Sequence, residues 1–384
     1  MIHKPQYSLV ETEIRELIKQ NGHISFAHFM ELALYHPQCG YYINKAGFGP
    51  NGDFFTAPMT LPTFGSLIAN QAMLMWLQLG KVSPINVIEL GAGNGQLGID
   101  FERHSERIDN QFCNALHYTA NDLSPKPSDF LRDWIQGEIS FTFENPSIII
   151  ANELLDAMPA HRVVMHNGEL KEIFIGLNEA GDFQEYFLGL TTSEIKDRFD
   201  TFGIELAEGH KTEMNLGMTK WFKYIYDMIP SGYLLLIDYG YEAHEYYNEF
   251  RMQGTLRCYY AHTLNMNPYI HVGKQDISIH VDFSTLRNIA HHTGFKLVKE
   301  KSQSQFLKDL GFEQYRDSIV RDRDLSLQVK NTNLRLLDLL IDDRGMGAFK
   351  VFIFAKNAPE PSGILAQKKD SDSPSILATT RHMP

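Results

Sequence analysis

The sequence predicts an α/β protein with a mostly parallel sheet that is covered by helices on both faces. Between about residues 85 and 360, strand-like apolar runs alternate with helical segments, which is the pattern of βαβ units. Three of these runs end on an acid, at Glu89, Glu153 and Asp238. Because ligands bind beyond the carboxyl ends of parallel strands, these acids indicate a functional site. The strand-like runs are 85–90, 116–122, 147–153, 161–166, 170–176, 232–240 and 349–356.

Residues 1–80 are predicted to form an N-terminal helical extension that ends in a long loop. Ser8 and Glu11 make a capping box, and residues 24–36 repeat apolar side chains at helical spacing. Residues 39–65 hold too many glycines, prolines and aromatic residues for a helix. Loops of this length are uncommon unless they are functional.

The sheet region is predicted to span residues 81–357 as one domain. Residues 178–215 are polar and irregular, which indicates an insertion. Residues 358–384 are rich in Pro, Ser and Asp, and this composition predicts a disordered tail.

Composition and charge exclude several classes of protein. The net charge of −12 argues against a nucleic-acid binder, which would carry a basic footprint. The three cysteines are widely spaced, so they predict neither a disulfide framework nor a metal site, and a reducing compartment follows. No apolar run approaches the ~20 residues of a membrane helix, and the N-terminus lacks a secretory signal. We therefore expect a cytoplasmic protein.

The glycine-rich turn after residue 90 fits two cofactor classes. Read from Gly93, it satisfies the dinucleotide pattern G-x-G-x-x-G. Read from Glu89, with Gly91, Gly93 and Gly95, it resembles motif I of S-adenosylmethionine (SAM) methyltransferases. A dinucleotide site needs its ribose-binding acid ~20 residues beyond the loop, whereas Asp122 comes later, after a helix. The residues favour SAM, and glycines that merely pack a helix on a strand are the alternative.

The run ending at Asn152 and Glu153 predicts side chains that face a cleft, since unpaired carboxylates are rarely buried. If a helix opens near Asn152, Glu153 and Asp156 share one of its faces. Alternatively, Asn152 is an N-cap and Asp156 interacts with the helix dipole. His280 and Asp282 lie two apart on a strand-like run and are expected to share a face, although Asp282 equally fits a helix start. The histidines show no convincing set of metal ligands.

Eight sequence blocks between residues 25 and 356 resemble, in order, the MidA-like family of SAM-dependent methyltransferases. They include "GDFFTAPMTLPTFG", "IELGAGNG", "ANELLDAMPAHR", "LLLIDYGY" and "DISIHVDFSTL". The resemblance implies a Rossmann-like SAM-methyltransferase sheet with an N-terminal helical extension and inserted elements on the substrate side. Mitochondrial members of the family are assembly factors of respiratory complex I that methylate an arginine of a core subunit. One departure is Met59, where relatives usually carry an acid.

The resemblance assigns roles to individual residues, and no metal is expected. The cofactor-binding residues it implies are Glu89, Gly91, Gly93, Gly95, Asp122, Leu123, Asn152, Gly52, Asp53 and Phe54. The expected catalytic residues are Glu153, Asp156 and Asp238, because carboxylates can clamp a protonated guanidinium by bidentate hydrogen bonds. His280 and Asp282 are expected to line the substrate cleft.

Protein-arginine methylation of a complex I subunit is thus the first functional hypothesis. A SAM-dependent enzyme acting on a small molecule or another nucleophile is the second, since Met59 replaces an acid. A SAM-binding assembly chaperone with little catalysis is the third, and a dinucleotide oxidoreductase is a distant fourth. The expected partner is a protein substrate, without nucleic acid or membrane insertion, and a homodimer is left open.

Overall fold

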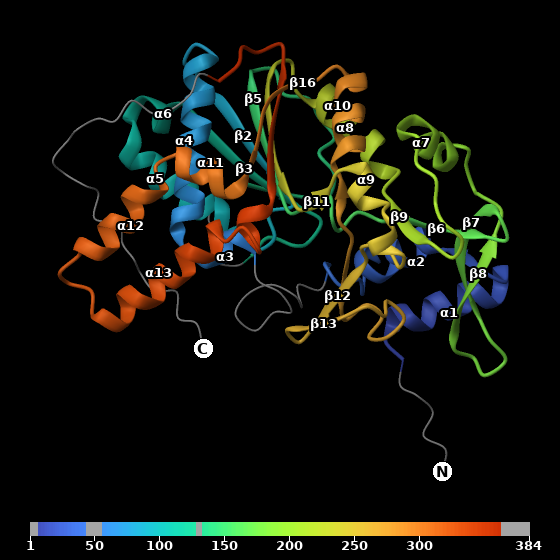
Figure 1. Ribbon diagram of the computed structural model, residues 1–384. Helices are drawn as coiled ribbons and strands as arrows, with labels where there is room; N and C mark the ends of the chain where they lie inside the picture. Colours follow the sequence, from blue (N-terminus) through green and yellow to red (C-terminus); the bar gives the residue numbers. More distant parts are fainter. Residues whose placement is uncertain (1–6, 44–55, 128–132, 362–384) are drawn as a thin grey trace. The chain divides into compact units, whose positions relative to one another are not determined.

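The computed structural model describes residues 7–43, 56–127 and 133–361, and the chain divides into two compact units (Figure 1). Residues 1–54, 155–222 and 240–289 belong to the first unit. The second unit comprises residues 55–154, 223–239 and 290–384. Each unit is therefore assembled from three separate stretches of chain. Residues 57–78, which lie within the predicted N-terminal extension, belong to the second unit.

Helices and strands follow one another along most of the described chain. The helices are α1 (Leu9–Asn21), α2 (Phe26–Tyr35), α3 (Ala57–Thr60), α4 (Pro62–Gln78), α5 (Gln96–Ile108), α6 (Asn110–Ala115), α7 (Glu194–Phe202), α8 (Gly217–Met228), α9 (Ala243–Tyr246), α10 (Phe283–Thr293), α11 (Gln303–Asp309), α12 (Phe312–Arg321) and α13 (Leu327–Ile341). The strands are β1 (Ile24–Ser25), β2 (Ile85–Leu90), β3 (Leu116–Asp122), β4 (Asp133–Gln136), β5 (Ser147–Asn152), β6 (His161–His166), β7 (Glu169–Leu177), β8 (Phe183–Leu188), β9 (Lys211–Met214), β10 (Gly232–Asp238), β11 (Gly240–Tyr241), β12 (Arg257–Tyr260), β13 (Thr263–Asn265), β14 (Asp276–Ser278), β15 (Val281–Asp282), β16 (Lys296–Ser302) and β17 (Lys350–Lys356).

The second unit is built on the mostly parallel sheet that the sequence predicts. Its seven strands have the order β16-β17-β10-β5-β2-β3-β4. The five strands from β10 to β4 are parallel, and β17 is antiparallel to both β10 and β16. The chain runs from β2 to β3 on one side and then places β5 on the other side of β2. This reversal is a topological switch point, where α/β sheets bind ligands.

One part of the core of the second unit lies between one face of this sheet and a group of helices. In Figure 1, α4, α5, α12 and α13 lie on the same side of the strands. Helix α4 is buried on all sides from Thr63 to Trp76, as expected of a helix inside a core. Every residue of β2 and of β10 is buried, so both faces of the sheet are covered. Alternate strand residues share the core with α4 and α5: Ile85, Val87, Ile148, Ile150, Leu235, Ile237, Val351 and Ile353.

The first unit contains an antiparallel sheet that differs from the prediction. Strands β6 and β7, expected to join the parallel sheet, form a hairpin in the order β1-β7-β6-β9, with β8 paired to β7. The reason is the two-residue turn at Asn167 and Gly168, which both have positive φ angles. An Asn-Gly pair favours a tight hairpin turn over a crossover connection.

Two further predictions concern the first unit. The N-cap half of the capping box is confirmed, because the N–H of Glu11 donates to the Ser8 hydroxyl over 3.1 Å at the start of α1, whereas the Glu11 carboxylate pairs with Arg15. The predicted insertion at 178–215 is more regular than expected, since it contains β8, α7 and β9. Strand β9 pairs with β6 and β8 with β7, so the insertion extends the antiparallel sheet.

Candidate functional site

The glycine turn joins β2 to α5 at the switch point of the second unit. Gly91, Gly93 and Gly95 have φ angles of 71°, 56° and 76°, a region that residues with a Cβ seldom adopt. Gly91 also has a steric role, because a Cβ there would lie 2.8 Å from Cδ1 of Leu154. The positive φ angles therefore favour glycine at all three positions of the turn.

Asp122 at the end of β3 holds this turn in place. Its Oδ2 accepts the N–H of Gly93 and its Oδ1 accepts the N–H of Ser124, both over 2.8 Å. The neighbouring Leu123 is 43% exposed. Both carboxylate oxygens keep acceptor capacity, since each has a second lone pair. The structure thus brings Asp122 and the glycine turn together at the carboxyl ends of β2 and β3.

Glu89 lies beneath the turn as a buried acid. Its Oε2 accepts the hydroxyl of Tyr118 over 2.7 Å, and the backbone N–H of Gly98 donates to the same carboxylate. Burial raises the pKa of Glu89 to about 8, against the opposing effect of the Tyr118 hydrogen bond. The carboxyl is therefore largely protonated at neutral pH. Any contact with a cofactor has to be compatible with the bond to Tyr118.

The end of β5 presents Asn152 and Glu153 in an irregular turn rather than the helix considered above. Glu153 has a φ of 50°, which is strained for a residue with a side chain. Its N–H donates to the carbonyl of Ile237 over 2.8 Å, which ties the turn to β10. Its Oε1 accepts the Asn152 amide over 3.0 Å and the N–H of Ala57 at the start of α3 over 3.3 Å.

The chemistry of this turn follows from burial. Desolvation raises the pKa of Glu153 to about 7, although the bonds from Ala57 and Asn152 act in the opposite direction. Oδ1 of Asn152 is buried and has no hydrogen-bond partner among the described residues. Asp238, at the end of the neighbouring β10, is fully buried, and its Oδ1 accepts the N–H of Tyr239. Two of the three predicted catalytic acids thus end adjacent parallel strands.

Comparison with known proteins identifies the family. The model of a family of S-adenosyl-L-methionine-dependent methyltransferases matches residues 67–300. The chain belongs to this methyltransferase family. A crystal structure of a COG1565 superfamily member from Burkholderia thailandensis, bound to S-adenosylhomocysteine, superposes with a TM-score of 0.79 at 26% identity, over 94% of this chain and 96% of that one.

Curated relatives of the methyltransferase carry more specific names. The Drosophila melanogaster protein arginine methyltransferase NDUFAF7 homolog is 26% identical, over 73% of this chain and 70% of the relative. Protein arginine methyltransferase NDUFAF7 of Danio rerio is 23% identical, over 93% and 88% of the two chains. Both names include the word mitochondrial, as does that of the human relative. The expectation of a cytoplasmic protein, which rested on the lack of a targeting signal, is therefore wrong.

The residues around the glycine turn fit the cofactor of this family. The turn carries no side chains at Gly91, Gly93 and Gly95, and Asp122 offers oxygen acceptors beside Gly93. The buried, unpaired Oδ1 of Asn152 is a further acceptor at the end of the adjacent strand. Acceptors suit the hydroxyl and ammonium donors of S-adenosylmethionine. Gly52, Asp53 and Phe54 of the predicted cofactor loop lie outside the described residues.

The remaining predicted site residues belong to the first unit of the methyltransferase. Asp156 lies in a turn and is 8% exposed, and its backbone carbonyl accepts the N–H of Ile279 over 2.9 Å. His280 and Asp282 line one small cavity together with Arg198, Tyr246 and Tyr247. This cavity is only large enough for about one water molecule.

His280 and Asp282 are held by different contacts. Asp282 precedes α10 and caps it, because its Oδ1 accepts the N–H of Thr285 over 3.0 Å and its Oδ2 accepts the Thr285 hydroxyl over 2.6 Å. The helix-start alternative thus describes its position. The His280 ring stacks on Tyr241 with centroids 4.9 Å apart. Burial, and then Arg257, lower the pKa of His280 to about 4, so the ring is neutral at pH 7.

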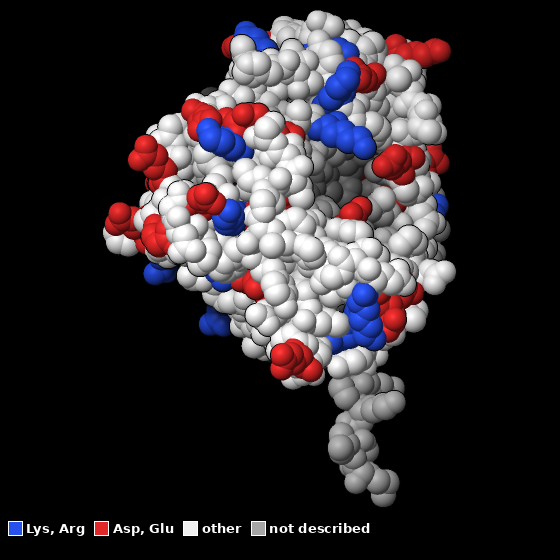
Figure 2. All heavy atoms as spheres, turned by 90° about the vertical axis from the view of Figure 1, so that its right-hand side faces the viewer, with Lys and Arg blue, Asp and Glu red and all other residues white. Residues whose placement is uncertain are grey.

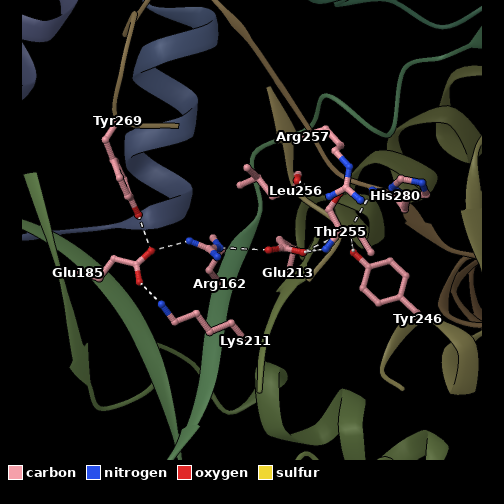
Figure 3. Close-up of polar contacts among 10 residues, drawn as sticks. All are labelled: Arg162, Glu185, Lys211, Glu213, Tyr246, Thr255, Leu256, Arg257, Tyr269 and His280. Carbon is pink, nitrogen blue, oxygen red and sulfur yellow. Dashed lines mark hydrogen bonds and ion pairs between the residues drawn. The ribbon is translucent and has the colours of Figure 1, made fainter. Parts of the chain in front are cut away.

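An ion-pair network is linked to His280 through Thr255 (Figure 3). Arg162 on β6 contacts Glu185 over 2.7 Å and Glu213 over 3.1 Å, and Figure 3 shows it between the two carboxylates. Glu213 accepts the N–H of Thr255 over 2.7 Å, and the Thr255 hydroxyl accepts the N–H of His280 over 3.1 Å. Removing one member would leave a buried charge without its partner, and the network reaches the backbone of His280 through Thr255.

On the described part of the face in Figure 2, basic side chains alternate with acidic ones and form no continuous stripe. Among the described residues, no group of three or more His, Cys, Asp or Glu side chains is arranged to hold a metal ion. None of the described helices is both long and apolar enough to span a membrane.

Two site residues escape prediction from the sequence. Tyr118 binds Glu89, and the N–H of Ala57 binds Glu153. Tyr118 has a weak signal, because it is a lone hydroxyl-bearing aromatic in the β3 run. Ala57 has no sequence signal, because its backbone N–H binds Glu153 and its side chain takes no part in the contact.

Proposed function

We propose that this methyltransferase transfers a methyl group from S-adenosylmethionine to an arginine side chain of a protein. The observation that carries the proposal is the carboxylate of Glu153, held in a strained turn at the end of β5, beside the strand that leads into the glycine turn. The printed names of the Drosophila and Danio relatives, both protein arginine methyltransferases, support this acceptor.

The glycine turn and its neighbours are proposed to bind the cofactor. Gly91, Gly93 and Gly95 would admit the methionine portion to the backbone, and Asp122 would accept hydrogen bonds from the ribose hydroxyls. Leu123, which is 43% exposed, offers an apolar surface for the adenine. Asn152 would use its free Oδ1. Glu89 is assigned an indirect role, because its carboxyl already binds Tyr118.

Glu153 is proposed to bind and orient the substrate guanidinium. The cofactor supplies a methyl group that is already electrophilic, so the protein mainly has to aim the nucleophile and remove a proton. A guanidinium stays protonated at neutral pH. A carboxylate with a pKa near 7 can hold this cation and accept the proton that the methylated nitrogen loses. Asp156 and Asp238 follow as candidates for the same role, in that order.

The substrate is proposed to be a subunit of respiratory complex I. The resemblance to MidA-like proteins supports this choice. The net charge of −12 also suits a cationic target segment.

Transfer of a tritiated methyl group tests the proposal. The purified protein is incubated with labelled S-adenosylmethionine and isolated complex I subunits, and the proteins are then hydrolysed to amino acids. We expect label in methylarginine, and its loss with Glu153→Gln. Label in methyllysine, or in a small molecule only, would contradict the arginine assignment.

A further inference from the structure

A second set of reactive side chains, none of them assigned to methyl transfer, lies in the first unit. Sγ of Cys39 is 3.0 Å from Nδ1 of His36, and Nε2 of the same ring is 2.6 Å from Oε2 of Glu13. Glu13 lies on α1, His36 directly follows α2, and Cys39 comes three residues later. The three side chains therefore form a chain of thiol, imidazole and carboxylate.

The hydrogen bonds define the tautomer of His36. The backbone N–H of Gln38 donates to Nδ1 over 3.3 Å, so this nitrogen is an acceptor. Nε2 then carries the proton and donates it to Glu13. With this tautomer, Nδ1 also accepts from the Cys39 thiol, and the imidazole is oriented as a general base. A carboxylate that orients an imidazole toward a nucleophile is the arrangement of a hydrolase triad.

The turn that carries Cys39 is fixed by its own backbone. The N–H groups of Cys39 and Gly40 both donate to the carbonyl of His36, over 3.2 and 2.9 Å. A Cβ on Gly40 would lie 2.4 Å from the backbone nitrogen of His36, so the turn closes only with glycine. Cys39 is partly exposed, whereas Cys258 is buried. A reagent from solvent can thus reach the thiol that His36 contacts.

We propose that Cys39, His36 and Glu13 form a nucleophilic thiol site that undergoes exchange with small disulfides. His36 takes the thiol proton as Sγ attacks one sulfur of the disulfide. A new S–S bond forms, the original S–S bond breaks, and the departing thiolate takes the proton from His36. The products are a mixed disulfide on Cys39 and one small thiol. Because Glu13 is negative and half exposed, neutral disulfides are the preferred class.

The resting state of the thiol agrees with this order of events. Burial, together with the Glu13 carboxylate, raises the pKa of Cys39. The thiol therefore keeps its proton until a base removes it, so its reactivity depends on His36 rather than on a standing thiolate.

Reaction with dithiodipyridine, a neutral disulfide that releases a coloured thione, tests the site in the full-length protein. Mass spectrometry identifies the modified cysteine. We expect Cys39 to react first and Cys39→Ser to abolish this phase. His36→Gln should slow it at least ~10-fold, since general bases contribute this much or more. Glu13→Gln should have a smaller effect. The matched control is His28→Gln, which changes an exposed histidine of α2 and should leave the rate of the Cys39 reaction unchanged.

Three outcomes would overturn the proposal. One is a Cys39 reaction no faster than that of a free cysteine at the same pH. Another is an equal rate in wild type and His36→Gln. Added imidazole should restore part of the rate in His36→Ala, and a failure of this rescue, with the fold intact by circular dichroism, would equally contradict a base at this position.

Discussion

Two turns at the carboxyl edge of one sheet reach positive φ angles in different ways. The turn after β2 uses Gly91, Gly93 and Gly95, which adopt these angles without strain. The turn after β5 places Glu153 at a φ of 50°, which costs about 1–3 kcal/mol for a residue with a side chain. The first turn therefore has no side chains at its three glycines, whereas the second places a carboxylate at a strained position. This difference is the basis on which we propose cofactor binding for the first turn and acceptor chemistry for the second.

The largest effect is expected from Glu153→Gln. The amide keeps the size of the side chain and an oxygen that accepts from Ala57, but it cannot take a proton. We expect kcat to fall at least ~100-fold, the lower range for loss of a general base. Affinity for S-adenosylmethionine, measured by calorimetry, should be unchanged. Glu144→Gln, on an exposed residue just before β5, is the control. A parallel loss of cofactor affinity would remove the distinction between the two turns.

Gly91→Ala should break the other turn. The new Cβ would meet Leu154 at 2.8 Å on a backbone with a φ of 71°. We expect a loss of stability of about 1–3 kcal/mol and a cofactor affinity at least ~10-fold lower. Gly80→Ala shares the positive φ, at 80°, but has nothing within 4 Å of its Cβ. Gly80→Ala should therefore lose stability but bind the cofactor with wild-type affinity. Equal cofactor affinities in Gly80→Ala and Gly91→Ala would refute the steric role of Leu154.

Asp122→Ala should weaken cofactor binding without touching the strained turn. It removes the acceptor for the N–H groups of Gly93 and Ser124. Since hydrogen bonds to a charged group contribute about 1.5–3 kcal/mol each, we expect cofactor affinity to fall at least ~10-fold. The cofactor affinity of Asp122→Asn, which keeps one side-chain oxygen, should lie between those of the wild type and Asp122→Ala. Titration calorimetry measures both, and wild-type affinity in Asp122→Ala would exclude this residue from the site.

The smallest effect concerns the pH dependence of stability. Glu89 has a pKa of about 8 in the fold and 4.5 without it, so the folded protein binds the extra proton between these values. Its contribution is present below pH ~4.5 and is lost as the pH rises through ~8. Urea unfolding should show stability falling over this range, and Glu89→Gln should flatten the slope. Part of the slope should remain in Glu89→Gln, because the pKa of Glu153 is raised too. Glu106→Gln, at an exposed position of α5, should keep the full slope.

The sequence indicates the first turn better than the second. Glycines at alternate positions predict positive φ angles directly, and the apolar runs predict the parallel strands around them. The strained turn at Glu153 is held by the bond from its N–H to Ile237, which lies on a strand 84 residues further along the chain. No local pattern encodes that contact. No local pattern predicts the position of Asp156 either. It was expected to share a helix with Glu153, but it lies in an irregular turn.

Other features of the structure have a local sequence signal. The Asn-Gly pair at 167–168 predicts the hairpin that removes β6 and β7 from the parallel sheet. The helical run after Asp282 makes a helix start one of its two predicted positions, and its contacts with Thr285 agree with that alternative. Tyr118 remains beyond prediction, because its bond to Glu89 depends on the register of β2 and β3.

The pH profile of methyl transfer to an arginine peptide tests the central role of Glu153 most directly. The substrate guanidinium does not titrate near neutrality, so an inflection of kcat/KM there must come from the enzyme. We predict that kcat/KM rises with pH up to about 7 and then levels off in the wild type and in Glu89→Gln. The low residual activity of Glu153→Gln should lack this inflection. A wild-type profile that is flat from pH 5.5 to 8.5 would contradict the account.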